Sequence, residues 1–142
     1  MPAPGGSDGP APSAVADLLA HARQGLDRVA PEALEDERAA GALVVDIRPE
    51  ANRTTEGCLP GSVVIDRNVL EWRLDPTSPD RIAQADRQDL RVIIVCNEGY
   101  ASSLAAESLR RLGLFRATDL DGGYRAWRRD RRASIAGLPE PV

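Results

Sequence analysis

The sequence is poor in the residues that mark several classes of protein. It has two cysteines, one histidine and few aromatic side chains among 142 residues, and all 18 of its basic residues are arginine. Two isolated cysteines do not suit a disulfide scaffold or a paired zinc motif. No apolar run approaches the roughly 20 residues of a membrane-spanning helix, and the first residues lack the order of a secretory signal. We therefore expect a cytoplasmic protein without a metal site and without a membrane partner.

The length and composition fit a single globular domain. With 42% hydrophobic residues, the chain can bury one core, built mainly from Val, Ile, Leu and Ala. The net charge of -4 argues against a nucleic-acid partner, because nucleic-acid binders usually carry a basic surface. Residues 1–13 are rich in Pro, Gly and Ser. We expect them to form a flexible tail before one domain at residues 14–142.

Short β-branched runs alternate with helical stretches along the chain, which predicts an α/β fold. Strands are expected at residues 43–47, 62–65 and 92–95, with a weaker one at 117–120. Helices are expected at about residues 14–25, 31–41, 68–74, 101–112 and 123–131. This alternation is typical of a parallel sheet covered by helices on both faces. In such sheets the ligand site lies at the carboxyl ends of the strands.

The stretch from residue 92 to residue 104 carries the clearest functional signal. A hydrophobic strand leads into Cys96, then into a short loop containing Gly99, and then directly into an amphipathic helix. Loop amides and the helix N-terminus favour negative charge, so this arrangement would stabilise a thiolate, a persulfide or a bound anion. A buried cysteine that only ends a core strand is the alternative. The order of strand, cysteine, loop and helix favours a reactive Cys96.

Several separated motifs together resemble the single-domain rhodanese-like sulfurtransferase family. They are an Asp-x-Arg after the strand at 43–48, a Pro-Gly turn at 57–62, the six-residue loop at 96–101, a Gly-Gly pair at 120–123 followed by Trp127, and a closing tripeptide at 137–139. The resemblance covers about residues 28–142. It implies a three-layer rhodanese-like fold with a five-stranded parallel sheet and helices on both faces.

The resemblance also implies a mechanism. The Cys96 thiolate would take sulfur from thiosulfate, a thiosulfonate or a persulfide, including a protein persulfide, and pass it to a thiol or cyanide. The loop residues that would bind the persulfide are Asn97, Glu98, Gly99, Tyr100, Ala101 and Ser102. The family needs no metal or organic cofactor. Related phosphatases have a longer loop that ends in arginine, and Ala101 stands at that place here, so phosphatase activity is not expected.

The loop departs from the usual family pattern Cys-Arg-x-Gly-x-Arg. Asn97 and Ala101 replace both arginines, and Glu98 adds a carboxylate that would repel the thiosulfate dianion by about 1 kcal/mol at about 4 Å in water. These changes keep a second hypothesis open, in which the protein is a non-catalytic binding or regulatory module of the same fold. The first hypothesis, a sulfurtransferase, remains the leading one.

Other residues could support the site. Asp46 is expected to accept hydrogen bonds beneath the loop. Four arginines follow strand ends and could supply anion-binding charge, although each also fits a solvated surface position: Arg48, Arg53, Arg67 and Arg73. Tyr100 and Trp72 could form an apolar rim for an organic thiol, and packing is an equal alternative for Trp72.

Two further features each have two interpretations. Cys58 stands in the Pro-Gly turn, where the family usually has histidine. We interpret it as a bystander, with a resolving or disulfide-forming thiol as the alternative. The basic run at residues 128–132 fits a solvated helix end, with a docking surface for an acidic partner as the alternative.

Overall fold

The structure is a computed structural model that describes residues 11–136. Most of the tail predicted at residues 1–13 and the whole tripeptide at 137–139 lie outside this range. In chain order the elements are α1 (Ala14–Arg23), the 3-10 helix η1 (Pro31–Ala33), α2 (Leu34–Ala39), β1 (Leu43–Asp46), α3 (Glu50–Glu56), β2 (Val63–Val64), η2 (Arg67–Val69), α4 (Leu70–Leu74), β3 (Val92–Val95), α5 (Ala101–Arg111), β4 (Thr118–Asp119) and α6 (Gly123–Ala136). No helix in the described range is long and apolar enough to cross a membrane.

The strands form one parallel sheet in the order β2-β1-β3-β4. The parallel sheet is confirmed, but the expected number of five strands is wrong for residues 11–136. Where the fifth strand would lie, Val29 makes a single bridge to Leu120, through hydrogen bonds to Asp119 O and from the Asp121 amide. Pairing cannot continue because Pro31 follows closely, has no N–H group and begins η1.

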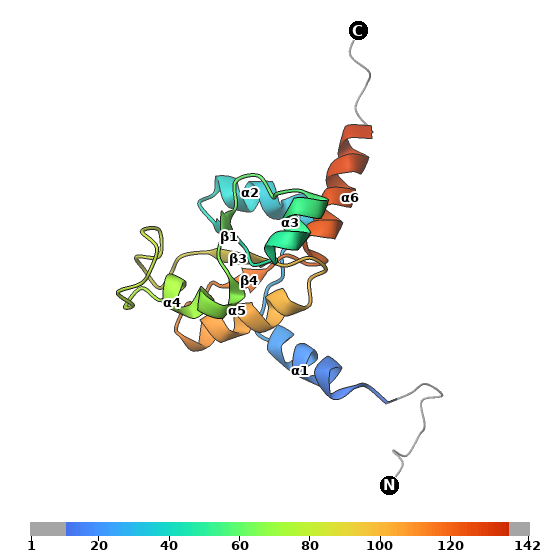
Figure 1. The fold of residues 1–142 in the computed structure, drawn as a ribbon. Coiled ribbons are helices and arrows are strands. Elements are labelled where there is room, and N and C mark those ends of the chain that lie inside the picture. The colour runs from blue at the N-terminus through green and yellow to red at the C-terminus, as the bar shows by residue number, and fades with distance from the viewer. Residues whose placement is uncertain (1–10, 137–142) are drawn as a thin grey trace.

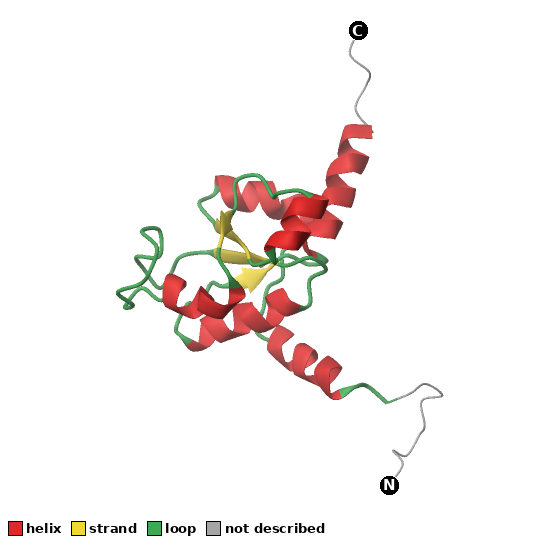
Figure 2. Cartoon of the chain, in the orientation of Figure 1, coloured by secondary structure: helices red, strands yellow, loops and turns green. Residues whose placement is uncertain are grey.

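Helices cover both faces of the sheet, as Figures 1 and 2 show. On one face, the core includes Val44 and Ile93 from the strands and Trp127 from α6. On the other face, Val45 and Ile94 pack in the same core as Leu109 from α5. Neighbouring strand residues thus point to opposite faces, and all of β3 is buried. A strand covered on both faces explains the continuous hydrophobic run that precedes Cys96.

Some boundaries differ from the sequence prediction. α3 was not predicted, because its seven residues are mostly polar and include two threonines; it begins directly after Pro49. α6 continues to Ala136, beyond the expected end at residue 131. α1 begins at Ala14 behind Ser13, whose side chain accepts a hydrogen bond from the Ala16 amide, and α1 packs against α5 (Figure 1).

A carboxylate joins α4 to α5 near one end of the sheet. Glu71 on α4 accepts hydrogen bonds from Ser108 Oγ at 2.6 Å and from Arg67 Nη1 at 2.8 Å. Burial acts to raise the pKa of Glu71, but the hydrogen bonds from Ser108 and Arg67 outweigh it and the pKa is lowered. The stability linked to this group is therefore present above the ordinary value of 4.5 and is lost as pH falls through the lower folded-state pKa.

We predict that Glu71→Gln lowers the free energy of unfolding by about 1 kcal/mol at pH 7, because the charged hydrogen bonds are lost. The difference from the unmodified protein should shrink as the pH falls below 4.5. Urea unfolding at several pH values measures it. Glu107→Gln is the control, since the partner of Glu107 among residues 11–136 is the exposed Arg111. This substitution should change stability by less than about 0.5 kcal/mol. A Glu71→Gln effect that does not depend on pH would contradict this account.

Candidate active site

Cys96 lies at the end of β3 with its sulfur enclosed by the loop that follows. The residue is 7% exposed. Its Sγ accepts the Gly99 amide at 3.1 Å and the Ser102 amide at 3.3 Å. Ser102 lies in the first turn of α5, whose N-terminus carries the positive end of the helix dipole. The sulfur therefore occupies a position that stabilises a thiolate or another sulfur anion.

The N-terminus of α6 also binds the backbone of the cysteine loop. Tyr124 N donates to Cys96 O at 2.8 Å, and Arg125 N donates to Asn97 O at 3.1 Å. This approach leaves no room for side chains: a Cβ on Gly123 would lie 2.6 Å from Cys96 O, and one on Gly99 would lie 2.7 Å from Gly122 N. Gly123 is thus explained by close backbone packing against the cysteine loop, whereas a Cβ on Gly122 would lie 2.4 Å from Ala126 Cβ in α6.

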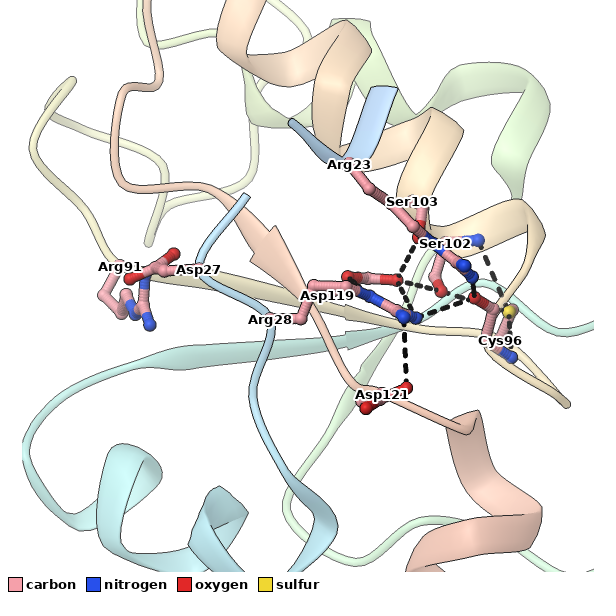
Figure 3. A network of polar contacts seen from close by, with 10 residues as sticks. Arg23, Asp27, Arg28, Arg91, Cys96, Ser102, Ser103, Asp119 and Asp121 are labelled. Atoms are coloured by element: carbon pink, nitrogen blue, oxygen red, sulfur yellow. Dashed lines mark hydrogen bonds and ion pairs between the residues drawn. The ribbon is translucent and has the colours of Figure 1, made fainter. Parts of the chain in front are cut away.

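A buried carboxylate lies beneath the loop, as Figure 3 shows. Asp119 at the end of β4 is fully buried and accepts hydrogen bonds from Ser102 Oγ at 2.7 Å, Ser103 Oγ at 2.8 Å and Arg28 Nε at 3.0 Å. Cys96 Sγ lies 3.2 Å from Ser102 Oγ. Since the single hydroxyl proton of Ser102 is directed to Asp119, its lone pairs remain for the S–H group of a protonated Cys96.

Two arginines connect this network to the loop backbone. Arg23 Nη2 and Arg28 Nη2 both donate to Gly99 O, at 2.7 and 2.9 Å. Burial acts to lower the pKa of Arg28, but Asp119 and Asp121 outweigh it, and the pKa is raised. Sequence reasoning missed these two arginines and Asp119. The sequence did contain one signal for them. Asp119 lies within the weak fourth strand, and a carboxylate buried in a strand requires a positively charged or hydrogen-bonding partner.

A pocket of about 550 Å³ opens over Cys96. Its lining combines the cysteine loop, the segment after β1, α3, η2 and the start of α6: Ile47, Arg48, Pro49, Asn52, Arg67, Cys96, Asn97, Glu98, Tyr100, Ala101 and Arg125. Seven of the predicted site residues meet here, whereas Asp46, Gly99 and Ser102 are not part of the lining. Among residues 11–136, no three His, Cys, Asp or Glu side chains are grouped as a metal ion requires.

Each arginine that lines the pocket is paired with a carboxylate. Arg48 Nη2 lies 2.8 Å from Asp46 Oδ2, with both side chains fully buried, and its guanidinium stacks 3.8 Å over the Tyr124 ring. Asp46 accepts hydrogen bonds from the Arg48 amide at 2.9 Å and from the Arg48 guanidinium. Arg48 is less available as an anion ligand, although its Nη1 is buried and unpartnered among the described atoms. Arg67 pairs with Glu71 at 2.8 Å.

Arg125 is a pocket residue that the sequence did not indicate. It pairs with Glu56 at 2.8 Å and with Glu98 at 2.5 Å, so the loop carboxylate has a cation beside it. Its hydrogen bond to Glu56 raises the pKa of Arg125 and lowers the pKa of Glu56. The arginines of the pocket and their partners amount to three guanidiniums and four carboxylates, which leaves no excess positive charge for a dianion.

The remaining candidates lie elsewhere. Arg53 donates to Arg48 O and lines a neighbouring hollow, and Arg73 donates to Asp80 O. Cys58 and Cys96 are both free thiols, and Cys58 is exposed outside the pocket. Trp72 is 59% exposed and lines a separate hollow, so neither the rim nor the packing role expected for it is seen.

We predict that Arg28→Gln lowers the free energy of unfolding by about 3 kcal/mol, because the buried Asp119 charge loses its partner. Arg111→Gln is the matched control, since this arginine is 73% exposed in its ion pair and should contribute less than about 0.5 kcal/mol. Urea unfolding at pH 7 measures both variants. Equal effects of the two substitutions would show that the Arg28–Asp119 pair does not stabilise the fold.

Comparisons with known proteins agree with this geometry. The model of the rhodanese-like domain family matches residues 30–130. Thiosulfate sulfurtransferase GlpE of Stutzerimonas stutzeri is 37% identical over 101 residues, which are 71% of this chain and 84% of that protein. The protein of the same name from Pseudomonas aeruginosa is 36% identical over 103 residues, which are 72% and 84% of the two chains.

Solved structures show the same fold. A protein of unknown function from Rhodopseudomonas palustris, described as a possible tyrosine phosphatase, has a TM-score of 0.74 and 27% identity, covering 96% of this chain and all of that one. The human single-domain sulfurtransferase TSTD1 has a TM-score of 0.62 and 24% identity, covering 72% and 95%. With the family model matching well over half of its length, the chain belongs to the rhodanese-like domain family.

Proposed function

We propose that the protein is a sulfurtransferase that moves a sulfane sulfur from thiosulfate, a thiosulfonate or a persulfide to a thiol or cyanide. Cys96 is the nucleophile that carries the sulfur. The observation that supports this most directly is the position of Sγ at the Gly99 and Ser102 amides. Relatives named thiosulfate sulfurtransferase, more than one third identical to this chain, support the same chemistry. Two free thiols fit a reducing compartment, and we place the protein in the cytoplasm.

The reaction proceeds by two displacements at sulfur. In the first, the Cys96 thiolate attacks the outer sulfur of the donor and forms an S–S bond. The donor's own bond to that sulfur breaks, and its electron pair leaves with sulfite, a sulfinate or a thiolate. In the second, the acceptor attacks the outer sulfur of the persulfide, and the electron pair of the S–S bond returns to Cys96 as a thiolate. Charge and electrons balance in both steps.

The loop backbone performs the main electrostatic work in this scheme. The Gly99 and Ser102 amides contact the Cys96 sulfur directly and lie at the N-terminus of α5, so they stabilise the attacking thiolate. We assign binding of the outer persulfide sulfur to the loop amides from Asn97 to Ser102. Arg23 and Arg28 act as positioning residues, because they fix the carbonyl of Gly99 and thereby the direction of its neighbouring amides.

Phosphatase activity fits this site poorly, although one structural relative is described as a possible tyrosine phosphatase. A phosphate ester dianion needs a cation at the loop, and Ala101 provides none. The pocket arginines are already paired with carboxylates. Incubation with p-nitrophenyl phosphate should release no nitrophenol above the rate of the Cys96→Ser variant.

We predict that incubation with thiosulfate, a thiosulfonate or a cysteine persulfide adds one sulfur atom to the protein, as measured by intact mass. The addition should vanish in Cys96→Ser and persist in Cys58→Ser, which removes the other free thiol. A cyanide chase should release the added sulfur as thiocyanate. Absence of sulfur addition with every donor would support the non-catalytic binding module instead.

We predict that Gly99→Ala lowers kcat/KM by about 100-fold, because the added Cβ displaces the loop and its amide from the sulfur. Gly41→Ala is the matched control. Gly41 also has a positive φ, +106° against +85° for Gly99, but a Cβ there meets nothing within 4 Å. Gly41→Ala should lose about 1 kcal/mol of stability from backbone strain. Gly99→Ala should lose more, because its Cβ would also lie 2.7 Å from Gly122 N, and only Gly99→Ala should lose activity. A similar loss of activity in both would contradict the proposed role of the loop amides.

A further inference from the structure

A second hollow adjoins the catalytic pocket, and we call it the α1 groove. Its volume is about 410 Å³, within the range of small-molecule sites. The lining consists of Val15, Ala16 and Leu19 from α1, with Tyr100, Ala101 and Leu104 on the other side. Tyr100 and Ala101 also line the pocket over Cys96, so the groove and the pocket are adjacent.

The groove is open to solvent despite its apolar lining. Val15 is 65% exposed and Tyr100 is 59% exposed. Exposed apolar surface of this kind is typical of binding sites. The helix that forms one wall is fixed in place, because Arg23 at its end donates to Gly99 O and to Ser103 Oγ. α1 lies outside the segment matched by the family model, so this wall is an addition to the shared domain.

The charges at the pocket restrict which sulfur compound fits. Glu98 is half exposed at the pocket lining, and its partner Arg125 is shared with Glu56. No excess positive charge favours a dianion such as thiosulfate over a donor with a single charge. A monoanionic donor with a hydrocarbon group loses less electrostatic free energy here and gains from burial of that group.

We propose that the α1 groove binds the hydrocarbon arm of an organic sulfane-sulfur donor, of which alkyl thiosulfonates are the test class, while the terminal sulfur reaches Cys96. This inference rests on the proposed sulfurtransferase function. The Cys96 thiolate forms an S–S bond with the terminal sulfur, and the bond between that sulfur and the sulfonyl group breaks. The electron pair leaves with the sulfinate, so no oxidant or reductant is needed.

The chain-length dependence of KM tests the proposal in the unmodified protein. With methane-, butane- and hexanethiosulfonate as donors and cyanide as acceptor, KM should fall by about two- to fourfold for each methylene that enters the groove. Equal KM values across the series, with normal sulfur loading of Cys96, would overturn the groove and leave the proposed function standing. Failure of all three donors and of thiosulfate to load Cys96 would overturn both.

Two substitutions on α1 locate the effect. Val15 lines the groove, whereas Leu18 is exposed to a similar extent, 55%, and is not part of the lining. Val15→Ser should raise KM for hexanethiosulfonate about fivefold and flatten the chain-length dependence, while Leu18→Ser should keep the values of the unmodified protein. Because both side chains are exposed, neither variant should unfold, which circular dichroism checks. Identical KM values in the two variants would overturn the proposal.

Discussion

The carboxylate of Asp119 is fully buried at the end of β4 and holds together three segments that are distant in the sequence. Arg28, which comes 91 residues earlier, supplies the compensating positive charge, and α5 supplies the hydroxyls of Ser102 and Ser103. A buried carboxylate without such partners would be strongly destabilising. Arg28 also donates to Gly99 O. The ion pair that compensates the buried charge of Asp119 therefore also fixes the position of the cysteine loop.

This arrangement has a consequence for the sulfur itself. The Ser102 hydroxyl has one proton and cannot donate to Asp119 and to Cys96 Sγ at once. In the protonated state, the thiol donates to Ser102 and Ser102 donates to Asp119. In the anionic state, the hydroxyl is free to turn toward the sulfur, because Asp119 keeps its bonds from Ser103 and Arg28. Asp119 thus keeps hydrogen-bond donors whether Cys96 is a thiol or a thiolate, and its buried charge stays paired in both states.

Short-range patterns predicted the parts of the structure that depend on neighbouring residues. The parallel sheet and the loop after Cys96 follow from hydrophobic runs and from residues adjacent in the chain. Five strands are not formed within residues 11–136 because pairing at Val29 ends near Pro31, which begins η1. The pairing of Arg28 with Asp119 was not predictable, since no local pattern connects residues so far apart. Arg48 lies only two residues from Asp46, but the Tyr124 ring that covers its guanidinium comes from a distant part of the chain, so sequence could not show this packing.

The unusual residues of the loop affect which sulfur donor can approach Cys96 more than they affect the hydrogen bonds around its Sγ atom. Sγ is contacted by backbone amides, and the glycines at positions 99 and 123 allow the close packing that aims them. Replacing the usual loop arginines by Asn97 and Ala101 leaves those amides in place, because side-chain identity does not alter an N–H group. The same replacement removes the charges that attract a small dianion. Ala101 also lines the apolar groove against α1. The nucleophile and its selectivity are therefore set by different parts of the chain: the backbone of one loop for the chemistry, and the side chains of α1 and Tyr100 for the choice of donor.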